Sequence, residues 1–353
     1  ADELNAAFAK KGGPAVAGLA LSGLPPRPGG AKPGAAPSEA PPAAPPHGRQ
    51  SATPTPASLD EVYGEAWPAK VARLKRSSPL GREPGWGLTA LISKANDDVR
   101  QEAFVMQLIR VLHDAMPAPL WLRPYHILST GPRSGLIEMV TDTKSVDQLK
   151  RRRGYTSLRA HFETHYGPPT ASTFLEAQAN FAASLAAYSV VCYVLAIKDR
   201  HNGNLLLDRQ GHLIHIDFGF VMGGAPGGPA SFACPERGVP FKLTREMVMV
   251  LGGKHAPLYR ETFSELCVAA MRAARAHGQA LLSLCEMTAY RSALPCFAAG
   301  GASPVQQMRE RLMLDVPDEQ LAARVQGLID RSYDSSGTAA YDLYQQMSNG
   351  IRQ

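Results

Sequence analysis

Residues 198–220 read KDRHNGNLLLDRQGHLIHIDFGF, and polar side chains crowd around two short apolar runs in this stretch. The segments NLLLD and LIHID have the length and composition of β-strands, and RQG between them is typical of a turn. In an antiparallel hairpin the polar ends of both strands would lie at one rim. The stretch therefore predicts a hairpin that brings Asp199, His201, Asn204 and Asp217 together.

These side chains are of the kinds that transfer of the ATP γ-phosphate requires. The reaction needs an acid–base group beside the attacking hydroxyl, and carboxylate and amide oxygens that hold Mg²⁺ on the phosphates. Asn204 follows Asp199 by five residues, and Asp217, which opens DFG, follows Asn204 by thirteen. This spacing indicates a kinase catalytic loop followed by a metal-binding loop. The alternative is that the polar groups only tie the hairpin to the preceding helix, a packing role that we do expect for His212 and His215.

The composition fits an enzyme without selecting one. The 353 residues, 44% of them hydrophobic, can form one large domain or two ordinary ones. The formal net charge of +6 is a mild bias toward anionic partners and leaves polyphosphates, anionic lipids and nucleic acid open. The five cysteines show no metal-ligand spacing, which indicates reduced, mostly buried thiols of an intracellular protein. Residues 185–197 form the longest apolar run, which is shorter than the roughly 20 residues that a bilayer needs and predicts a buried helix.

The beginning of the chain has a different composition. Residues 12–58 are dominated by Pro, Ala and Gly and carry too few apolar side chains to offset the entropy of ordering. We therefore expect a disordered linker over residues 1–58, with order beginning at Leu59 behind Ser58 as a helix N-cap. The first residue is Ala and no signal segment follows, which favours a processed chain or a fragment.

The ordered part begins with a mixture of strands and helix and becomes mainly helical. Residues 88–94 and 135–140 have strand patterns, and residues 97–116 between them have a helical pattern. Thr173 and Glu176 form a capping box that predicts the start of a long helix leading into the hairpin.

These patterns predict an α+β architecture in two lobes. A small mixed α/β N-lobe is expected over residues 59–140, and a larger, mainly helical C-lobe over residues 141–353.

The order of residues in the catalytic loop narrows the kinase class. Protein kinases begin this loop with H-R-D, whereas Asp199, Arg200 and His201 reverse that order, and together with HIDFGF they resemble the phosphoinositide kinase superfamily. The stretches GWGLTALISKANDDVRQEAF, PLWLRPYHIL, GLIEMV, PFKLTREMVMVLGG and YDLYQQMSNGI resemble the catalytic domain of type III phosphatidylinositol 4-kinases, nearer the beta form than the alpha form. The resemblance covers the chain from about residue 59 onward. It implies a two-lobed protein-kinase-like fold that transfers the ATP γ-phosphate to the 4-hydroxyl of phosphatidylinositol.

The resemblance also assigns residues to the ATP phosphates. Lys94 would contact a phosphate, and Glu102 would organise the pocket around this lysine and Tyr125. The loop that contains Ser77 and Ser78 would cover the phosphates, using hydroxyl and amide groups because it lacks a G-x-G-x-x-G pattern.

The resemblance assigns a second set of residues to the adenine ring. The backbone of residues 137–140, which includes Glu138, Met139 and Val140, would bond the adenine edge. Ile216 would form an apolar wall beside the ring.

The catalytic and metal-binding roles follow from the same motifs. Asn204 and Asp217 would bind Mg²⁺, with Mn²⁺ as an alternative metal, and Arg200 would brace the loop. The sequence leaves Asp199 and His201 open as the acid–base group. The resemblance favours His201 at the lipid hydroxyl, with Asp199 orienting it or sharing the role, and an imidazole suits proton removal near neutral pH.

Substrate choice is expected to lie in residues 220–244, at the position of an activation loop. The basic residues there are Arg237 and Lys242, too few to clasp a headgroup that already carries several phosphates. Phosphatidylinositol, with a single phosphodiester, is the expected acceptor. The Gly- and Pro-rich residues 221–240 depart from the family pattern, because the segment is somewhat longer and lacks the usual Gly-Phe-Glu.

A lipid substrate implies a membrane partner. The run KRRR at residues 150–153 could attract anionic lipid at about 1 kcal/mol for each basic residue, or it could be an ordinary solvated face. The last helix could present an apolar face to the membrane or pack against the domain. We expect peripheral association with the cytosolic face of an internal membrane, Golgi-like by resemblance, with recruiting protein partners and no nucleic acid.

The alternatives to a phosphatidylinositol 4-kinase are a phosphatidylinositol 3-kinase, a protein kinase of the same superfamily and a non-catalytic kinase-fold scaffold.

Overall fold

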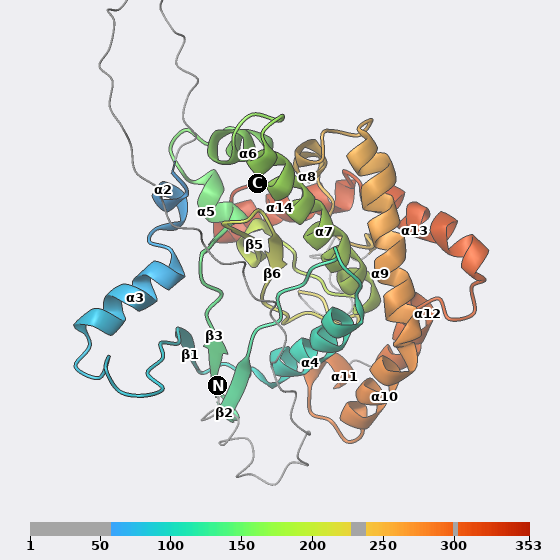
Figure 1. Cartoon of the computed structure of the whole chain (residues 1–353). Coiled ribbons are helices and arrows are strands. Elements are labelled where there is room, and N and C mark those ends of the chain that lie inside the picture. The colour runs from blue at the N-terminus through green and yellow to red at the C-terminus, as the bar shows by residue number, and fades with distance from the viewer. Residues whose placement is uncertain (1–57, 227–237, 299–302) are drawn as a thin grey trace, which may run out of the picture. The chain divides into compact units, whose positions relative to one another are not determined.

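A computed structural model of the chain describes residues 58–226, 238–298 and 303–353, and residues 54–353 form one compact unit (Figure 1). The linker expected over residues 1–58 lies outside the described residues except for Ser58. The N-cap prediction is confirmed, because the Ser58 hydroxyl accepts a hydrogen bond from the Asp60 backbone N–H at 3.2 Å.

The first elements build a small antiparallel sheet with a helix packed beside it. They are α2 (Leu59–Tyr63), α3 (Trp67–Ser77), β1 (Leu91–Ala95), α4 (Arg100–Ala115), β2 (Ile127–Gly131) and β3 (Ser134–Glu138). β3 lies between β1 and β2, and Lys94 pairs with Gly135. Gly135 is required where α4 approaches the sheet, since a Cβ at this position would lie 2.3 Å from Val99 Cγ2. The predicted strands and helix are confirmed, with ends that differ by a few residues.

A second small sheet contains the hairpin predicted within residues 198–220. The elements of this part are β4 (Thr143–Ser145), α5 (Val146–Lys150), α6 (Leu158–Tyr166), α7 (Ser172–Val194), η1 (Asn202–Asn204), β5 (Leu205–Asp208) and β6 (Leu213–His215). The strand order is β4-β5-β6, with Leu205 opposite His215. The Ile216 N–H donates to the Asn204 carbonyl at 3.1 Å, so the predicted hairpin is confirmed up to its polar rim.

The remainder of the described chain is helical. Its elements are α8 (Arg245–Val250), the π-helical segment η3 (Leu258–Phe263), α9 (Ser264–Ala276), α10 (Gly278–Ala289), α11 (Pro295–Ala298), α12 (Pro304–Arg311), α13 (Asp318–Ser332) and α14 (Ser336–Asn349). Figure 1 shows α9 beside α7 and α13, and contacts between these helices agree with the picture. Of these elements, η3, α9 and α12 pack directly against α7.

The long helix α7 is the centre of the core. Its apolar run is buried as predicted, and no helix of the described residues is both long and apolar enough to cross a membrane. The capping box predicted at its start is wrong. The N-cap is Ala171, and the Thr173 hydroxyl donates to the Tyr166 carbonyl instead. Because α7 begins at Ser172, Thr173 lies inside the first turn, and its hydroxyl donates to the end of α6 rather than accepting a backbone N–H as a cap would.

The predicted α+β class with a small strand-rich part and a larger helical part is confirmed. The boundary near residue 140 between the two lobes stays a prediction, because residues 54–353 group as one unit. The four described cysteines are buried, as expected. Cys234 lies outside the described residues.

The stability of the fold should depend on a buried histidine. His161 on α6 is 6% exposed, and burial, helped by the neighbouring His165 and Arg152, lowers its pKa to about 3. The folded protein therefore keeps His161 neutral, while the unfolded chain binds a proton below about pH 6.5. The free energy of unfolding should fall by about 1 kcal/mol per pH unit as the pH drops from 6.5 toward 3.

Urea unfolding at several pH values checks this expectation. His161→Gln should reduce the slope of stability against pH, whereas His255→Gln, at an exposed position, should leave it unchanged. A slope that is the same in wild type and His161→Gln would contradict the assignment.

Candidate functional site

A cavity of about 570 Å³ lies between the two sheets and the start of α4. Its volume is in the range of small-molecule sites. The predicted site residues that line it are Lys94, Glu102, Tyr125, Glu138, Met139, Val140, Asn204, Ile216 and Asp217. The structure thus brings the expected nucleotide-binding and metal-binding residues to one cavity, although they are spread over more than 120 positions of the sequence.

The catalytic loop meets this cavity at Asn204. The Asn204 side-chain Nδ2 donates to the Asp199 carbonyl at 3.0 Å, which ties the loop to the cavity wall. Asp199 and Asp217 both have left-handed backbone conformations, with φ values of 64° and 61°. Such strain persists only where the surroundings enforce it, and it is common at functional sites.

The conformation of the loop is enforced by Arg200, which is only 2% exposed. Its guanidinium donates to the Lys198 carbonyl at 3.0 Å and to the Ile216 carbonyl at 2.7 Å, and it also bonds the Asp217 carbonyl. It lies 5.3 Å from the centre of the Phe218 ring. Arg200 therefore ties the catalytic loop to the backbone of the DFG segment, and its role in catalysis stays a prediction.

The two acid–base candidates lie next to each other. His201 Nε2 is 3.8 Å from Asp199 Oδ1, and burial lowers the pKa of His201 more than the neighbouring carboxylate raises it. His201 Nδ1 accepts the Gly203 backbone N–H at 3.1 Å, so the neutral ring carries its proton on Nε2. In this arrangement His201 offers a donor, and Asp199 offers the acceptor.

The C-terminal helix α14 holds Asp199 in place. The Tyr341 hydroxyl donates to Asp199 Oδ1, and Gln345 Nε2 donates to the same oxygen at 3.3 Å. Gln345 also donates to the Tyr341 hydroxyl at 2.7 Å. Asp199 Oδ2 makes no hydrogen bond to another described residue, and it remains available to a substrate proton.

The residues at the metal position have suitable ligand atoms. The Asn204 amide nitrogen is engaged by the Asp199 carbonyl, which leaves the amide oxygen of Asn204 for a cation. Asp217 Oδ1 accepts only a long bond from the Gly219 N–H, at 3.4 Å, and the carboxylate lines the cavity. Mg²⁺ usually takes one or two protein oxygens, with water and phosphate oxygens completing its shell. The pair Asn204 and Asp217 fits this mode of binding.

The wall opposite the metal position carries the predicted lysine. Lys94 Nζ lies 3.3 Å from Asp97 Oδ2, and both groups are partly exposed. Glu102 accepts a hydrogen bond from the Tyr125 hydroxyl at 2.8 Å. Burial raises the pKa of Glu102, and the bond from Tyr125 opposes this change. Glu102 therefore organises Tyr125 as expected, whereas Lys94 pairs with Asp97, which sequence reasoning missed.

The connecting segment after β3 leaves one donor for a ligand. The Glu138 N–H donates to the His126 carbonyl and the Met139 N–H to the Ala90 carbonyl, at 2.8 and 2.9 Å. The Val140 N–H has no acceptor among the described residues, and Val140 lines the cavity. Of the three residues predicted to bond adenine, Val140 therefore has the free backbone donor.

The serines predicted to cover the phosphates lie at the end of α3. The Ser77 hydroxyl donates to the Leu74 carbonyl at 3.3 Å, and the Ser78 hydroxyl accepts the Leu80 N–H at 3.2 Å. Neither serine lines the cavity, so their contact with ATP stays a prediction.

The two predicted headgroup residues have different outcomes. Arg237 lies outside the described residues. Lys242 Nζ is bound to both carboxylate oxygens of Asp342 on α14, at 2.6 and 2.7 Å, and its side chain has no exposed surface. This placement argues against a headgroup contact by Lys242, because a buried ammonium with a carboxylate partner is not available to a membrane lipid. The ion pair holds the end of the activation segment on α14.

Sequence reasoning also missed the residues that connect these parts. Gln101 Nε2 donates to the Gly219 carbonyl at 2.7 Å, and Gln101 Oε1 accepts the Cys296 N–H at 2.8 Å, so α4 is tied to the DFG segment and to α11. Tyr341 and Gln345 lie on the last helix, for which the sequence predicts packing or membrane contact but no link to Asp199. Their spacing of four residues on one helix face was a signal for a shared partner.

The chain matches known families and proteins over most of its length. Residues 88–298 match the family model described as phosphatidylinositol 3- and 4-kinase. The chain is 42% identical over 295 residues to a phosphatidylinositol 4-kinase of Dictyostelium discoideum, covering 82% of this chain and 24% of the relative. It is 42% identical over 300 residues to phosphatidylinositol 4-kinase beta 2 of Arabidopsis thaliana, covering 83% and 26%. Phosphatidylinositol 4-kinase beta of Xenopus laevis is 39% identical over 290 residues, with 81% and 35% covered. The chain thus spans about a quarter to a third of the length of these relatives.

Proposed function

This chain belongs to the phosphatidylinositol 3- and 4-kinase family, and on that premise we propose that it transfers the γ-phosphate of ATP to the 4-hydroxyl of phosphatidylinositol. The observation that carries this proposal is that Asn204 and Asp217 line one cavity with Lys94 and Val140, and that Asn204 is hydrogen-bonded to the catalytic loop at the Asp199 carbonyl. The choice of the 4-hydroxyl is supported by the names of the relatives that share about 40% of its residues.

The residues divide the work of the reaction. ATP would lie with its adenine edge at the Val140 N–H and its phosphates between Lys94 and Asp217. Asn204 and Asp217 would hold Mg²⁺, or Mn²⁺ in its place, and the bound metal would neutralise charge on the phosphate oxygens.

The proton of the attacking hydroxyl needs an acceptor at the rim. We assign this role to Asp199, whose Oδ2 is unoccupied, and the Nε2 proton of His201 would stabilise the negative charge that develops beside it. The inositol oxygen forms a bond to the γ-phosphorus, the bond from that phosphorus to the β–γ bridging oxygen breaks, and ADP leaves.

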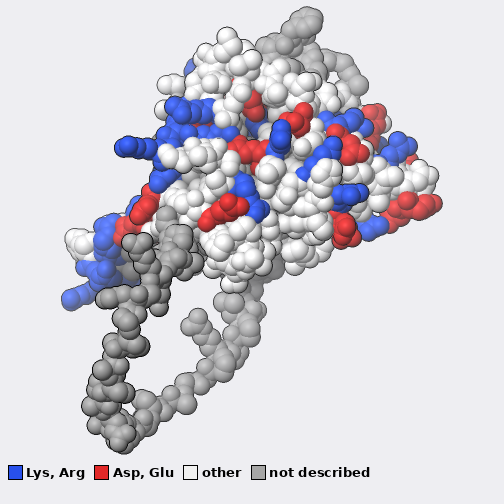
Figure 2. All heavy atoms as spheres, turned by 90° about the horizontal axis from the view of Figure 1, so that it is seen from above, with Lys and Arg blue, Asp and Glu red and all other residues white. Residues whose placement is uncertain are grey.

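A lipid acceptor requires contact with a membrane. Arg152 and Arg153 are exposed, and Figure 2 shows a group of Lys and Arg side chains gathered at one side of the face seen from above. Arg151 is instead paired with Asp147 at 2.8 Å. The exposed side chains of Tyr344 and Met347 on α14 add an apolar surface. These features support peripheral association with a membrane surface. We carry over the internal, Golgi-like location and the recruiting protein partners from the family resemblance alone.

An assay of product regiochemistry tests the function. With ATP, Mg²⁺ and vesicles that contain phosphatidylinositol, the expected product is phosphatidylinositol 4-phosphate, separated from the 3-phosphate by chromatography of the deacylated lipid. Product at the 3-position would replace the proposal by a phosphatidylinositol 3-kinase. Turnover of a protein substrate without lipid product would show a protein kinase, and no turnover of either would favour a scaffold.

A further inference from the structure

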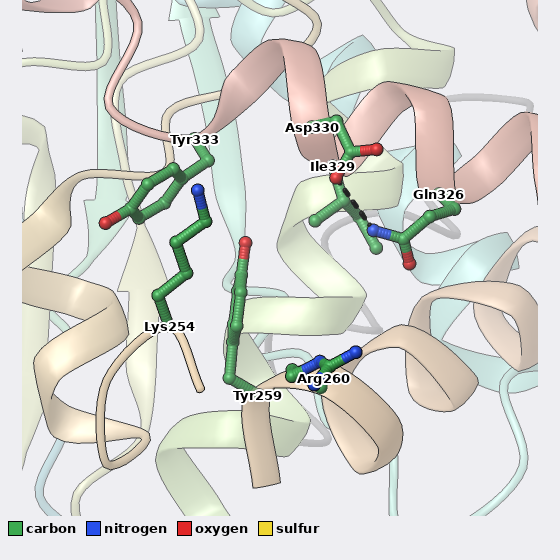
Figure 3. Close-up of a pocket in the computed structure, with 7 residues that line it drawn as sticks. All are labelled: Lys254, Tyr259, Arg260, Gln326, Ile329, Asp330 and Tyr333. Carbon is green, nitrogen blue, oxygen red and sulfur yellow. Dashed lines mark hydrogen bonds between the residues drawn. The ribbon is translucent and has the colours of Figure 1, made fainter. Parts of the chain in front are cut away.

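A second cavity, of about 490 Å³, lies between η3 and α13 and shares no lining residue with the catalytic cavity (Figure 3). The residues that line it are Lys254, Tyr259, Arg260, Gln326, Ile329, Asp330 and Tyr333. η3 is π-helical, a widened turn that is rare in proteins and is often found at functional sites. Nothing in the catalytic mechanism uses this cavity.

Hydrogen-bond donors without partners dominate the cavity. Tyr259 is only 8% exposed, and Figure 3 shows its hydroxyl directed into the cavity. This hydroxyl makes no hydrogen bond to another residue of the described chain, and burial, with help from Asp330, raises the pKa of Tyr259 to about 12. The hydroxyl therefore stays protonated, and because its oxygen is accessible from the cavity it can donate a hydrogen bond to a ligand or to water there.

Two cations line the same cavity. Lys254 Nζ lies 5.2 Å from the centre of the Tyr333 ring, and Arg260 follows Tyr259 on η3. Within the described ranges, neither Lys254 nor Arg260 has a carboxylate within ion-pair distance. The cavity therefore combines an ammonium, a guanidinium and a phenol, which together match the oxygens of a phosphate group.

One acidic side chain opposes these cations. Asp330 is exposed at the edge of the cavity, and its Oδ1 accepts a hydrogen bond from Gln326 Nε2 at 2.9 Å. Gln326 is itself held through its Oε1 by the Ser264 hydroxyl at 2.9 Å. With Lys254 and Arg260 against Asp330, the lining keeps one net positive charge.

The walls of the cavity are apolar and aromatic. The rings of Tyr259 and Tyr333 lie 6.0 Å apart at an angle of 46°, and Ile329, almost fully buried, also lines the cavity. The volume is larger than inorganic phosphate needs, and two rings offer surface to an organic group.

We propose that this cavity binds an organic phosphate monoester. The phosphate is held by Lys254, Arg260 and the Tyr259 hydroxyl, and the organic part lies against the two tyrosine rings. The phosphate group can belong to a soluble molecule or to a lipid headgroup, and the chemistry of recognition is the same for both.

Calorimetric titration of the full chain with phenyl phosphate tests the proposal. Wild type should bind it saturably, and more tightly than inorganic phosphate or phenol, because each of these lacks one half of the contact. Tyr259→Phe should weaken binding about tenfold, the effect of losing one hydrogen bond to a charged group. Asp330→Asn should strengthen binding about two- to fivefold by removing the opposing charge. Absence of saturable binding, or equal affinity of wild type and Tyr259→Phe, would overturn the proposal.

The pair of variants also separates this cavity from the ATP site, to which neither residue belongs. Tyr259→Phe should keep the thermal midpoint of wild type, since its hydroxyl has no protein partner. If that variant fails to fold, Lys254→Gln tests the same cavity. Lys254 is exposed, and its replacement should weaken phenyl phosphate binding severalfold. Weakening by Asp330→Asn would count against the charge argument.

Vesicles identify the source of the phosphate. Phosphatidylcholine vesicles with phosphatidic acid carry a lipid phosphomonoester, and vesicles without it do not. Binding to the first kind alone, reduced by Tyr259→Phe, assigns a lipid headgroup. If the protein binds phenyl phosphate but wild type and Tyr259→Phe bind the phosphatidic acid vesicles equally, the ligand is a soluble phosphate.

Discussion

Replacing Asp217 by asparagine is expected to lower the rate of phosphate transfer on the order of a thousandfold, the scale on which loss of one major charge-stabilising contact acts. The Asp217 carboxylate lines the catalytic cavity and has only a long hydrogen bond to the Gly219 N–H at 3.4 Å. Its charge therefore adds little to folding and is available to a metal. Asparagine keeps the shape of the side chain but removes the charge that holds the cation.

The choice of asparagine matters because of the backbone. Asp217 has a φ of 61°, in the left-handed region that Asn and Asp tolerate and that alanine adopts only at a cost. Asp217→Asn should therefore keep the thermal midpoint of wild type, and Asp315→Asn, at an exposed position, is the matched control for activity. Binding of ATP should lose its dependence on Mg²⁺ in Asp217→Asn. A variant that retains wild-type turnover would refute the metal assignment.

Replacing Asp199 by asparagine is expected to cost more activity than replacing His201 by glutamine. Asparagine cannot accept a proton from the attacking hydroxyl, so Asp199→Asn should lower kcat by about a hundredfold to ten-thousandfold. Glutamine at position 201 can still donate an N–H toward the reacting groups, so His201→Gln should have a smaller effect. The difference follows from the Gly203 N–H, which occupies His201 Nδ1 and places the ring proton on Nε2.

Steady-state kinetics of both variants, with vesicles that contain phosphatidylinositol, decide between the two residues. Tyr341→Phe serves as a companion variant, because it removes a donor to Asp199 without touching the substrate site directly. It should lower kcat less than Asp199→Asn does and leave KM for ATP nearly unchanged. If His201→Gln proves the more damaging change, the histidine is the base and the arrangement described here must change before reaction.

The hairpin and its motifs could be predicted from sequence because their signals are local. The strand pattern of β5 and β6, the turn between them and the fixed spacing from Asp199 to Asp217 lie within 23 residues. The Ser58 cap and the strands around α4 could also be predicted, because their signals lie in short stretches of sequence. The capping box at Thr173 shows the limit of such signals. The helix begins at Ser172, before Thr173, and the Thr173 hydroxyl donates to the end of the neighbouring helix α6 instead of capping α7.

Other parts of the site depend on residues that are distant in the sequence. The donors to Asp199 come from α14, more than 140 residues away, and Lys242 is matched by Asp342 a hundred residues later. A lysine in an activation segment looks like a headgroup ligand until its partner is known. Whether such a charge faces solvent or a buried carboxylate is decided by packing between helices, which no short pattern encodes.

The sequence by itself therefore determined the fold class, the family and the order of the catalytic and metal-binding residues. Only the tertiary structure decided which of them are free to act: Val140 offers the unbonded N–H, Asp199 the unoccupied oxygen, and Lys242 is held in an ion pair. It also revealed the unpartnered hydroxyl of Tyr259 between η3 and α13. The physical reason is that residue type and spacing set which groups a chain carries, whereas burial and hydrogen-bond partners set which of those groups remain available to a ligand.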